Sequence, residues 1–194
     1  MLAMAKGLIF KYNADPGDPL MKDKISRTIC GLGLRDPDFW SNDYPVWAIC
    51  GPYYRKALES RDVVFFVPKR AAIGKARLDD YICTGILVVR DKLSREDVKV
   101  DSGLTQSYKA RYEVDLDAHL RKDNARTRRL RPLNFILGDS SKSKWFGRNM
   151  KYLRALLQEL DLQNIAERLS IRRIPYLEEE QARNLYRELV EKEL

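Results

Sequence analysis

The chain has 194 residues, a formal net charge of +8 at pH 7 and a hydrophobic fraction of 44%. This length supports one packed domain with appendages and is too short for two full-sized domains. No stretch approaches the roughly 20 apolar residues that cross a bilayer, and the first ten residues lack the apolar core of a secretory signal, so we expect a cytoplasmic protein with no membrane partner.

The first half of the chain predicts short strands separated by turns. Each predicted strand is an apolar run rich in β-branched or aromatic residues and bounded by Gly, Pro or Asp. The runs are residues 7–12, 45–50, 62–67 and 81–89. We also expect a short helix within 20–34 and a helical turn at 53–59. Gly85, inside the last of these runs, indicates a bulge or the bend of a barrel.

The second half changes from strands to helices. Alternating polar and apolar residues predict a strand over 111–120, and a further short strand is expected at 133–137. Leucines at helical spacing predict amphipathic helices within 149–169 and 177–194. The order favours an α+β fold, a small bent β-barrel with flanking helices over residues 1–150 and a C-terminal helical extension over 151–194, whose amphipathic helices pack on the barrel or extend from it.

Basic residues are concentrated in the first three quarters of the chain. Residues 1–150 hold 28 Lys or Arg against 19 Asp or Glu, whereas the remainder holds 8 against 9. Such a surface suits the phosphates of DNA or RNA, and the alternative is a solvated basic loop. The candidate contacts to a nucleic-acid backbone are Lys69, Arg70, Lys75, Arg77, Arg121, Lys122, Arg126, Arg128, Arg129 and Arg131.

Two polar segments that contain tryptophan are candidates for binding a base. Trp40 lies among turn residues, and an aromatic ring beside Ser and Asn can stack on a base while its neighbours read the base edge. The alternative is a loop that plugs the end of a barrel. A second segment, residues 138–148, has hydroxyls, lysines and Trp145, but lacks the spacing of a Walker loop, so nucleotide hydrolysis has no support.

No catalytic signature, metal site or cofactor site is expected. Cys30, Cys50 and Cys83 are odd in number and widely spaced, which argues against a disulfide framework or a zinc site. His119 is the only histidine, so any His-based catalytic set would depend on one residue. We therefore assign no catalytic residues, no metal and no cofactor.

The order of three motifs resembles a known superfamily. Ile9-Phe10-Lys11-Tyr12, then Val46 to Pro52 followed by Arg55-Lys56, then Arg61 to Val67, resembles the PUA-like superfamily that includes the EVE, ASCH and YTH domains. The resemblance is closest to the second type of nucleotide modification associated domain and covers roughly residues 7–150. It implies a bent β-barrel with a pocket for a flipped or modified base. Carried over to this sequence, the pocket residues would be Trp40, Ser41, Asn42, Tyr44, Ser140, Ser141, Trp145 and Arg148.

Three functions remain in competition at this point. The leading hypothesis is a non-enzymatic module that binds nucleic acid or a modified nucleotide, with basic loops for phosphates and an aromatic pocket for the base. The first alternative is an enzyme that modifies a base or nucleotide in the same pocket. The second is a protein-interaction module, in which the C-terminal helices bind a partner or form a homodimer.

Overall fold

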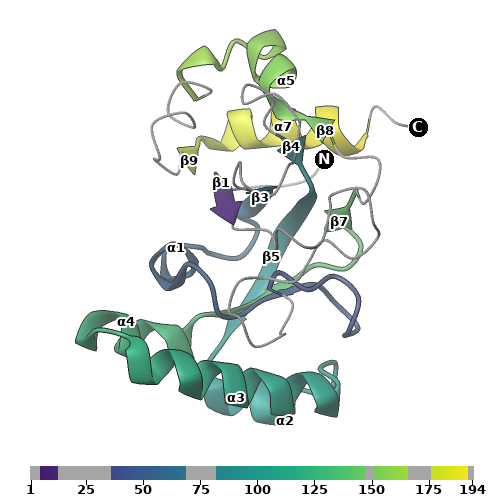
Figure 1. The fold of residues 1–194 in the computed structure, drawn as a ribbon. Helices are drawn as coiled ribbons and strands as arrows, with labels where there is room; N and C mark the ends of the chain where they lie inside the picture. Colours follow the sequence, from purple (N-terminus) through teal and green to yellow (C-terminus); the bar gives the residue numbers. More distant parts are fainter. Residues whose placement is uncertain (1–4, 13–35, 69–81, 147–150, 166–175, 192–194) are drawn as a thin grey trace, which may run out of the picture.

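A computed structural model describes residues 5–12, 36–68, 82–146, 151–165 and 176–191. The fold is mixed α/β, with a central sheet between a lower group of helices and an upper group (Figure 1). The strands are β1 Gly7–Tyr12, β2 Val46–Trp47, β3 Val63–Pro68, β4 Ile82–Cys83, β5 Gly85–Leu93, β6 Phe135–Gly138, β7 Lys144–Trp145, β8 Lys151–Tyr152 and β9 Tyr176–Leu177. The helices are α1 Pro52–Lys56, α2 Arg95–Val100, α3 Gln106–Lys122, α4 Ala125–Leu130, a 3-10 turn at Arg131–Leu133, α5 Leu153–Glu159 and α7 Glu179–Val190. None of the described helices is long and apolar enough to cross a membrane.

Seven strands form the main sheet in the order β2-β6-β5-β3-β1-β9, and β7 pairs with β5 beside this path. β1 and β3 are parallel, whereas β3 with β5, β5 with β6, and β6 with β2 are antiparallel. The strands expected at 7–12, 62–67 and 133–137 are confirmed within a few residues. The run at 81–89 is divided at Thr84 into β4 and β5, and the register shift of β5 lies between Val89 and Asp91 rather than at Gly85.

The sheet is strongly curled. Trp47 of β2 packs against Phe10 of β1 at 4.5 Å between ring centroids and against Phe66 of β3 at 5.4 Å, although β2 is not a neighbour of either strand. This contact requires the β2–β6 end of the sheet to fold over the face of β1 and β3. Within the described residues the path ends at β2 and at β9 without a pairing between them, so the sheet is curled and open where a closed barrel was expected.

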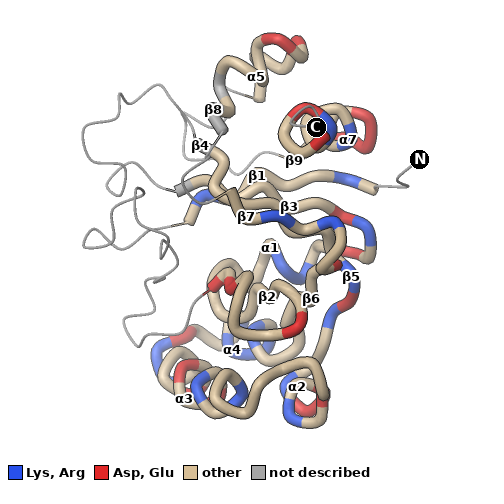
Figure 2. The backbone as a smooth tube through the Cα atoms, turned by 90° about the vertical axis from the view of Figure 1, so that its right-hand side faces the viewer, with Lys and Arg blue, Asp and Glu red and all other residues tan. Residues whose placement is uncertain are grey.

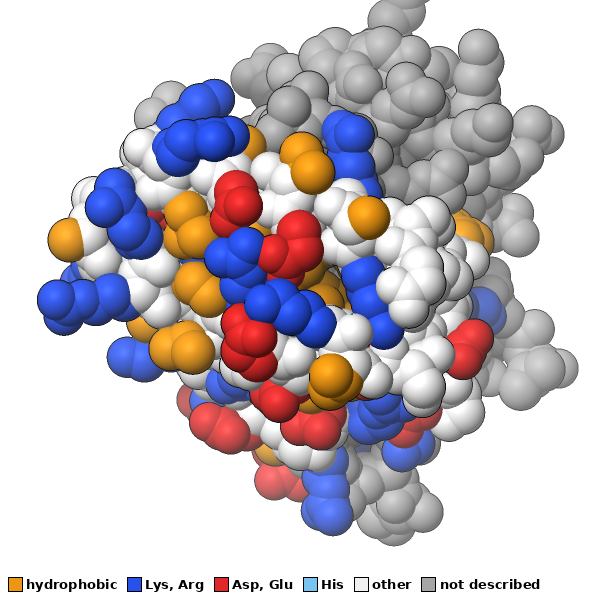
Figure 3. All heavy atoms as spheres, turned by 90° about the horizontal axis from the view of Figure 1, so that it is seen from below, with side chains coloured by type: hydrophobic (Ala, Val, Ile, Leu, Met, Phe, Trp, Pro, Cys, Tyr) orange, Lys and Arg blue, Asp and Glu red, His pale blue; other side chains and the backbone are white. Residues whose placement is uncertain are grey.

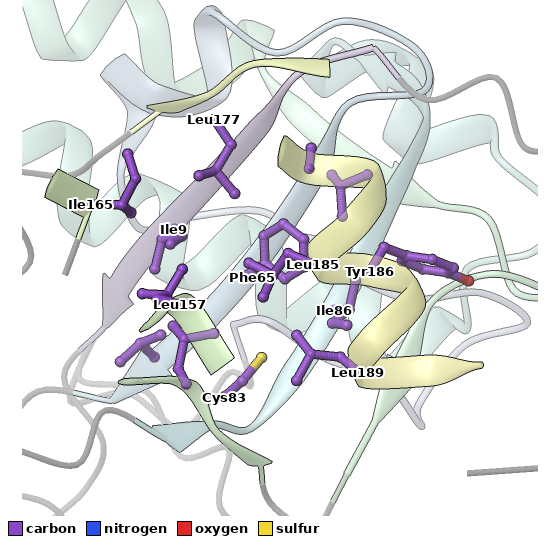
Figure 4. Close-up of a cluster of buried hydrophobic side chains, with 14 of the residues drawn as sticks. Ile9, Phe65, Cys83, Ile86, Leu157, Ile165, Leu177, Leu185, Tyr186 and Leu189 are labelled. Carbon is purple, nitrogen blue, oxygen red and sulfur yellow. The ribbon is translucent and has the colours of Figure 1, made fainter. Parts of the chain in front are cut away.

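The C-terminal segment shares its core with the sheet. Figure 4 shows Leu185 and Leu189 of α7 lying over Phe65 and Ile86, and the same buried cluster contains Leu157 of α5. β9 extends the sheet by pairing with β1 just before α7, and α7 confirms the helix predicted within 177–194. In Figure 2, α7 covers one side of β1 and β3, and helices α2 to α4 lie at the opposite end of the molecule. Residues 151–165 and 176–191 are therefore packed on the sheet rather than extended from it.

The strand expected at 111–120 is wrong, because these residues belong to helix α3. Tyr108, Tyr112 and Leu116 recur every four residues and pack against the outer face of β2 and β6, whereas Val114, apolar in the alternating pattern, is 57% exposed. Thr105 begins the helix by accepting a hydrogen bond from the Tyr108 amide at 3.3 Å. The helix expected within 20–34, Cys30 and the basic loop at 69–77 lie outside the described residues.

Candidate nucleic-acid interface

Three aromatic side chains from two distant segments meet beside the sheet. Ring centroids are 5.1 Å apart for Trp40 and Trp145, 5.4 Å for Phe39 and Trp145, and 6.0 Å for Phe39 and Trp40. Phe39 also contacts Phe66 of β3 at 6.3 Å, which joins the group to the core. Trp40 is 40% exposed. We refer to Phe39, Trp40 and Trp145 as the aromatic cluster; Phe39 was not among the residues predicted from the sequence.

The loop that carries Trp40 is held by a buried carboxylate. Asp38 is 1% exposed, and its Oδ1 accepts hydrogen bonds from the amides of Trp40 at 2.8 Å and Ser41 at 3.0 Å. The backbone of Asp38 pairs in both directions with Val46, which leads into β2. Because both ends of the turn are bonded, Trp40 is presented from a fixed backbone rather than from a free loop.

Trp145 is placed by a glycine on the neighbouring strand. β7 pairs with β5 so that Trp145 lies opposite Gly85, and a Cβ atom at Gly85 would stand 2.6 Å from Cε3 of the indole. Any side chain there would therefore displace the ring. The indole Nε1 is buried and has no hydrogen-bond partner within the described part of the chain. The β5–β7 pairing and Gly85 together fix the position of the Trp145 ring.

Two of the predicted pocket residues hold the loop instead of facing outward. Asn42 Oδ1 accepts a hydrogen bond from the Thr105 amide at 3.0 Å, at the start of α3. Tyr44 is buried, its hydroxyl donates to Asp101, and the Arg90 guanidinium covers its ring at 4.1 Å. Both side chains attach the Trp40 loop to the α2–α3 connection, so they position the site from behind.

The remaining predicted pocket residues belong to the turn between β6 and β7. Ser140 and Ser141 are exposed, and the Ser141 hydroxyl donates to Asp139 Oδ1 at 2.6 Å. Lys142 forms an ion pair with the same carboxylate at 2.9 Å. This turn leads directly into β7 and Trp145, and within the described residues its serines make no hydrogen bond to Trp40. Arg148 lies outside the described residues.

The basic run at 121–131 is helical rather than a loop. It covers the last turn of α3, all of α4 and the start of the 3-10 turn. Five of its cations are exposed, and we refer to them as the α3–α4 cationic surface, made up of Arg121, Lys122, Arg126, Arg128 and Arg129. Figure 3 shows Lys and Arg side chains along the α4 side of this face, whereas Asp and Glu lie among them over the middle of α3.

Arg131 differs from the other cations in the run. It is 7% exposed, and its guanidinium forms a two-pronged ion pair with Asp123, at 2.7 and 2.8 Å, while Nη1 donates to the carbonyl of Ile49. The side chain therefore points into the protein and is not available to a phosphate. Arg131 has to be removed from the predicted nucleic-acid contacts.

A buried charged group that sequence reasoning missed fixes the segment between β2 and α1. The Asp36 carboxylate accepts hydrogen bonds from the amides of Ala48, Ile49 and Cys50, and Arg55 donates to the carbonyls of Ile49 and Cys50. Burial lowers the pKa of Arg55 to about 10, against the opposing effect of Asp36, so the guanidinium stays charged at neutral pH. Burial raises the pKa of Asp36, and the charge of Arg55 opposes that rise. The backbone of residues 48–50 is bonded to the Asp36 carboxylate through its amides and to the Arg55 guanidinium through its carbonyls, which fixes the start of α1.

The aromatic cluster and the α3–α4 cationic surface lie at different places on the molecule. In Figure 1, β7 is on the right of the sheet and α4 is at the lower left. Helix α3 connects the two regions, because Thr105 at its first turn bonds Asn42 of the Trp40 loop and its last turn carries Arg121 and Lys122. The structure thus separates two features that the sequence placed around one pocket.

The other candidate chemical groups have structural surroundings. His119 Nδ1 lies 2.7 Å from the carbonyl of Asp115, one turn earlier in α3. Cys83 is fully buried, and burial raises the pKa of its thiol to about 12, so the thiolate is not populated at neutral pH. Cys83 forms no disulfide. Among the described residues, no three His, Cys, Asp or Glu side chains are grouped closely enough to hold a metal ion.

Comparison with known proteins finds no matching family model, no matching curated protein and no matching solved structure. The geometry of the aromatic cluster and of the cationic surface is therefore the basis for proposing a function.

Proposed function

We propose that this protein binds nucleic acid or a modified nucleotide, and that the aromatic cluster holds the base. The observation that carries the proposal is the meeting of Trp40 and Trp145, 5.1 Å apart, at a point where Trp40 remains 40% exposed. Burying both rings in the core would stabilise the fold more than leaving one at the surface. An exposed tryptophan on a fixed backbone is a surface on which a base can stack.

The polar groups around the cluster fit the same ligand. The turn of Ser140 and Ser141, both exposed, lies directly before β7 in the chain, and its hydroxyls can bond a base edge or a sugar. Stacking tolerates every base, so a preference for one modification would come from such edge contacts.

The proposal includes the resemblance to the PUA-like superfamily and its bent β-barrel. The curl of the sheet, in which β2 folds over β1 and β3, supports this assignment. Membership of this superfamily would not imply any chemical reaction, so the function has to be inferred from the site itself.

The test is the binding of short labelled oligonucleotides, plain and base-modified, DNA and RNA, measured by fluorescence anisotropy. Trp40→Ala should weaken binding about 5- to 160-fold, which corresponds to the roughly 1 to 3 kcal/mol of one stacked base. Tyr176→Ala is the matched control, because Tyr176 is 43% exposed and belongs to β9. Equal affinity of the folded Trp40→Ala protein and the parent would overturn the base site.

The same samples test the two rival functions. A change in the mass of a nucleotide after incubation would identify an enzyme that modifies it. A mass in solution that rises with concentration would identify a homodimer. The apolar residues of α7, Ala182, Leu185 and Leu189, are at most 1% exposed, so this helix does not offer the spare apolar face on which the dimer hypothesis was based.

A further inference from the structure

We infer that the α3–α4 cationic surface is a second binding surface, which contacts the phosphate backbone of a polymeric nucleic acid away from the aromatic cluster. The inference rests on the proposed function and makes it more specific. A ligand that occupies both surfaces must be an oligonucleotide or a longer chain, because a free nucleotide reaches only one of them.

The α3–α4 cationic surface exposes positive charges that the described residues do not neutralise. The only acidic residue in the run is Asp123, and the buried Arg131 neutralises it through two hydrogen bonds. The described part of the chain contains no ion pair to Arg121, Lys122, Arg126 or Arg129. The internal pair therefore neutralises the one carboxylate of the run, and Asp117, which lies beside Arg121, is itself paired with Arg95, so the surface keeps an excess of positive charge.

The middle of α3 provides a contrast on the same face. Arg95 of α2 forms ion pairs with Glu113 and with Asp117, the latter at 2.9 Å, so these charges neutralise one another. Arg111 lies 3.6 Å from Asp115. Excess positive charge is thus concentrated at the α4 end rather than spread along the helix, as Figure 3 also shows.

Side chains at the C-terminal end of α3 are held in place by hydrogen bonds. Arg128 donates to the carbonyls of Leu120 and Asp123, at 3.0 and 3.2 Å, which holds its guanidinium over the end of α3. An open depression between the helices is lined by Asp117, Leu120, Arg121 and Arg128. Side chains that are already ordered lose less conformational entropy when a phosphate binds.

An exposed tyrosine extends the surface onto α1. Tyr53 is 40% exposed, Arg126 covers its ring at 5.0 Å, and its hydroxyl is hydrogen-bonded to Thr127 Oγ1 at 3.1 Å. A guanidinium stacked on an aromatic ring keeps its edge free for phosphate oxygens. Cations with an aromatic ring among them are typical of nucleic-acid surfaces and add to what charge alone supplies.

The aromatic cluster and the α3–α4 cationic surface are separated by the length of helix α3. Helix α3 has 17 residues, and its first turn is bonded to the Trp40 loop while its last turn carries Arg121 and Lys122. At about 1.5 Å per residue the helix spans about 25 Å. Nucleotides along one strand of a duplex are about 3.4 Å apart, so roughly seven of them cover this distance. Binding to both surfaces therefore requires a chain of about that length.

The test compares two oligonucleotides, of about 4 and about 16 nucleotides, shorter and longer than this span. The variant Arg126→Gln/Arg128→Gln/Arg129→Gln should weaken binding of the long chain and lower the slope of log Kd against log salt by about 2 to 3, while binding of the short chain is unchanged. The control Lys6→Gln/Lys99→Gln/Arg187→Gln removes the same charge from α2, from α7 and from the residue before β1, and should leave the slope as it is.

The outcomes separate the two proposals. The second surface would be overturned if the arginine variant lost affinity for both oligonucleotides, or if the control variant lost as much affinity as the arginine variant. It would also be overturned if polyglutamate competed for the protein as well as the long oligonucleotide does. Trp40→Ala measured with the short chain tests the base site alone. If Trp40→Ala leaves binding of the short chain unchanged while the arginine variant weakens binding of the long chain alone, the proposal of a base site is wrong and that of the cationic surface stands.

Discussion

Arg126 and Arg131 are five residues apart in one basic run, yet their guanidiniums have opposite surroundings. Arg126 lies at the surface over the Tyr53 ring, whereas Arg131 is buried between Asp123 and the carbonyl of Ile49. Arg126 stands between Ala125 and Thr127, and Arg131 between Leu130 and Pro132, but these neighbours alone do not reveal which guanidinium is buried. Arg131 turns inward because the fold brings the Ile49 carbonyl, 82 residues away in the sequence, beside it together with Asp123.

Substitution of Arg131 should therefore affect stability, and that of its neighbour should not. Arg131→Met leaves Asp123 buried without its partner, and breaking a buried pair costs about 3 to 5 kcal/mol of unfolding free energy. Arg129→Met, at an exposed position in the same helix, should change it by less than about 0.5 kcal/mol. Urea denaturation measures both. Similar losses for the two variants would mean that the buried pair contributes little.

At the scale of elements, the strands of the sheet were readable from the sequence because residues 7–12 and 62–67 are apolar on both faces. Helix α3 was not readable, because an accidental polar–apolar alternation over 111–120 conceals its true period. The buried positions Tyr108, Tyr112 and Leu116 follow a spacing of four, and two of the three side chains carry hydroxyls. The capping Thr105 was the available signal, and it lies outside the alternating stretch.

The pairing of β5 with β7 yields a prediction about the aromatic cluster. Gly85→Ala places a methyl group 2.6 Å from the Trp145 ring and should displace it, so short oligonucleotides should bind as weakly as they do to Trp145→Ala. The measurement is anisotropy together with tryptophan emission. Glu180→Ala, at an exposed position of α7, is the control. Parent-like affinity of Gly85→Ala would show that the position of Trp145 does not matter for binding.

At the scale of the whole molecule, the division into residues 1–150 and 151–194 does not match how the core is built. Ile9, Phe65 and Ile86 of the sheet lie in one buried cluster with Leu157 and Leu185 of the C-terminal segment. The sequence left open whether the C-terminal helices pack on the sheet or extend from it, and in the described residues their apolar side chains are covered by the sheet.

Removal of residues 151–194 should accordingly unfold the protein. The sheet face that carries Ile9, Phe65 and Ile86 would meet water, and each large side chain exposed costs about 1.5 to 3 kcal/mol, which together exceeds the stability of a typical domain. Near-ultraviolet circular dichroism and urea denaturation of the truncated chain are the measurements. A cooperative transition, with oligonucleotide binding retained, would establish residues 1–150 as an independent domain.

The sequence by itself determined the positions of most strands, the basic charge of the first three quarters and the polar setting of Trp40. These are local properties, set by residue type and by spacing over a few residues. Only the tertiary structure decided that Trp40 meets Trp145, that Asn42 and Tyr44 face inward, and that Arg131 cancels Asp123 while five cations remain exposed. The reason is physical: each depends on contacts between segments about 60 to 105 residues apart, or on which side of a helix turns toward the core, and such contacts form only when the sheet curls and the helices pack on it.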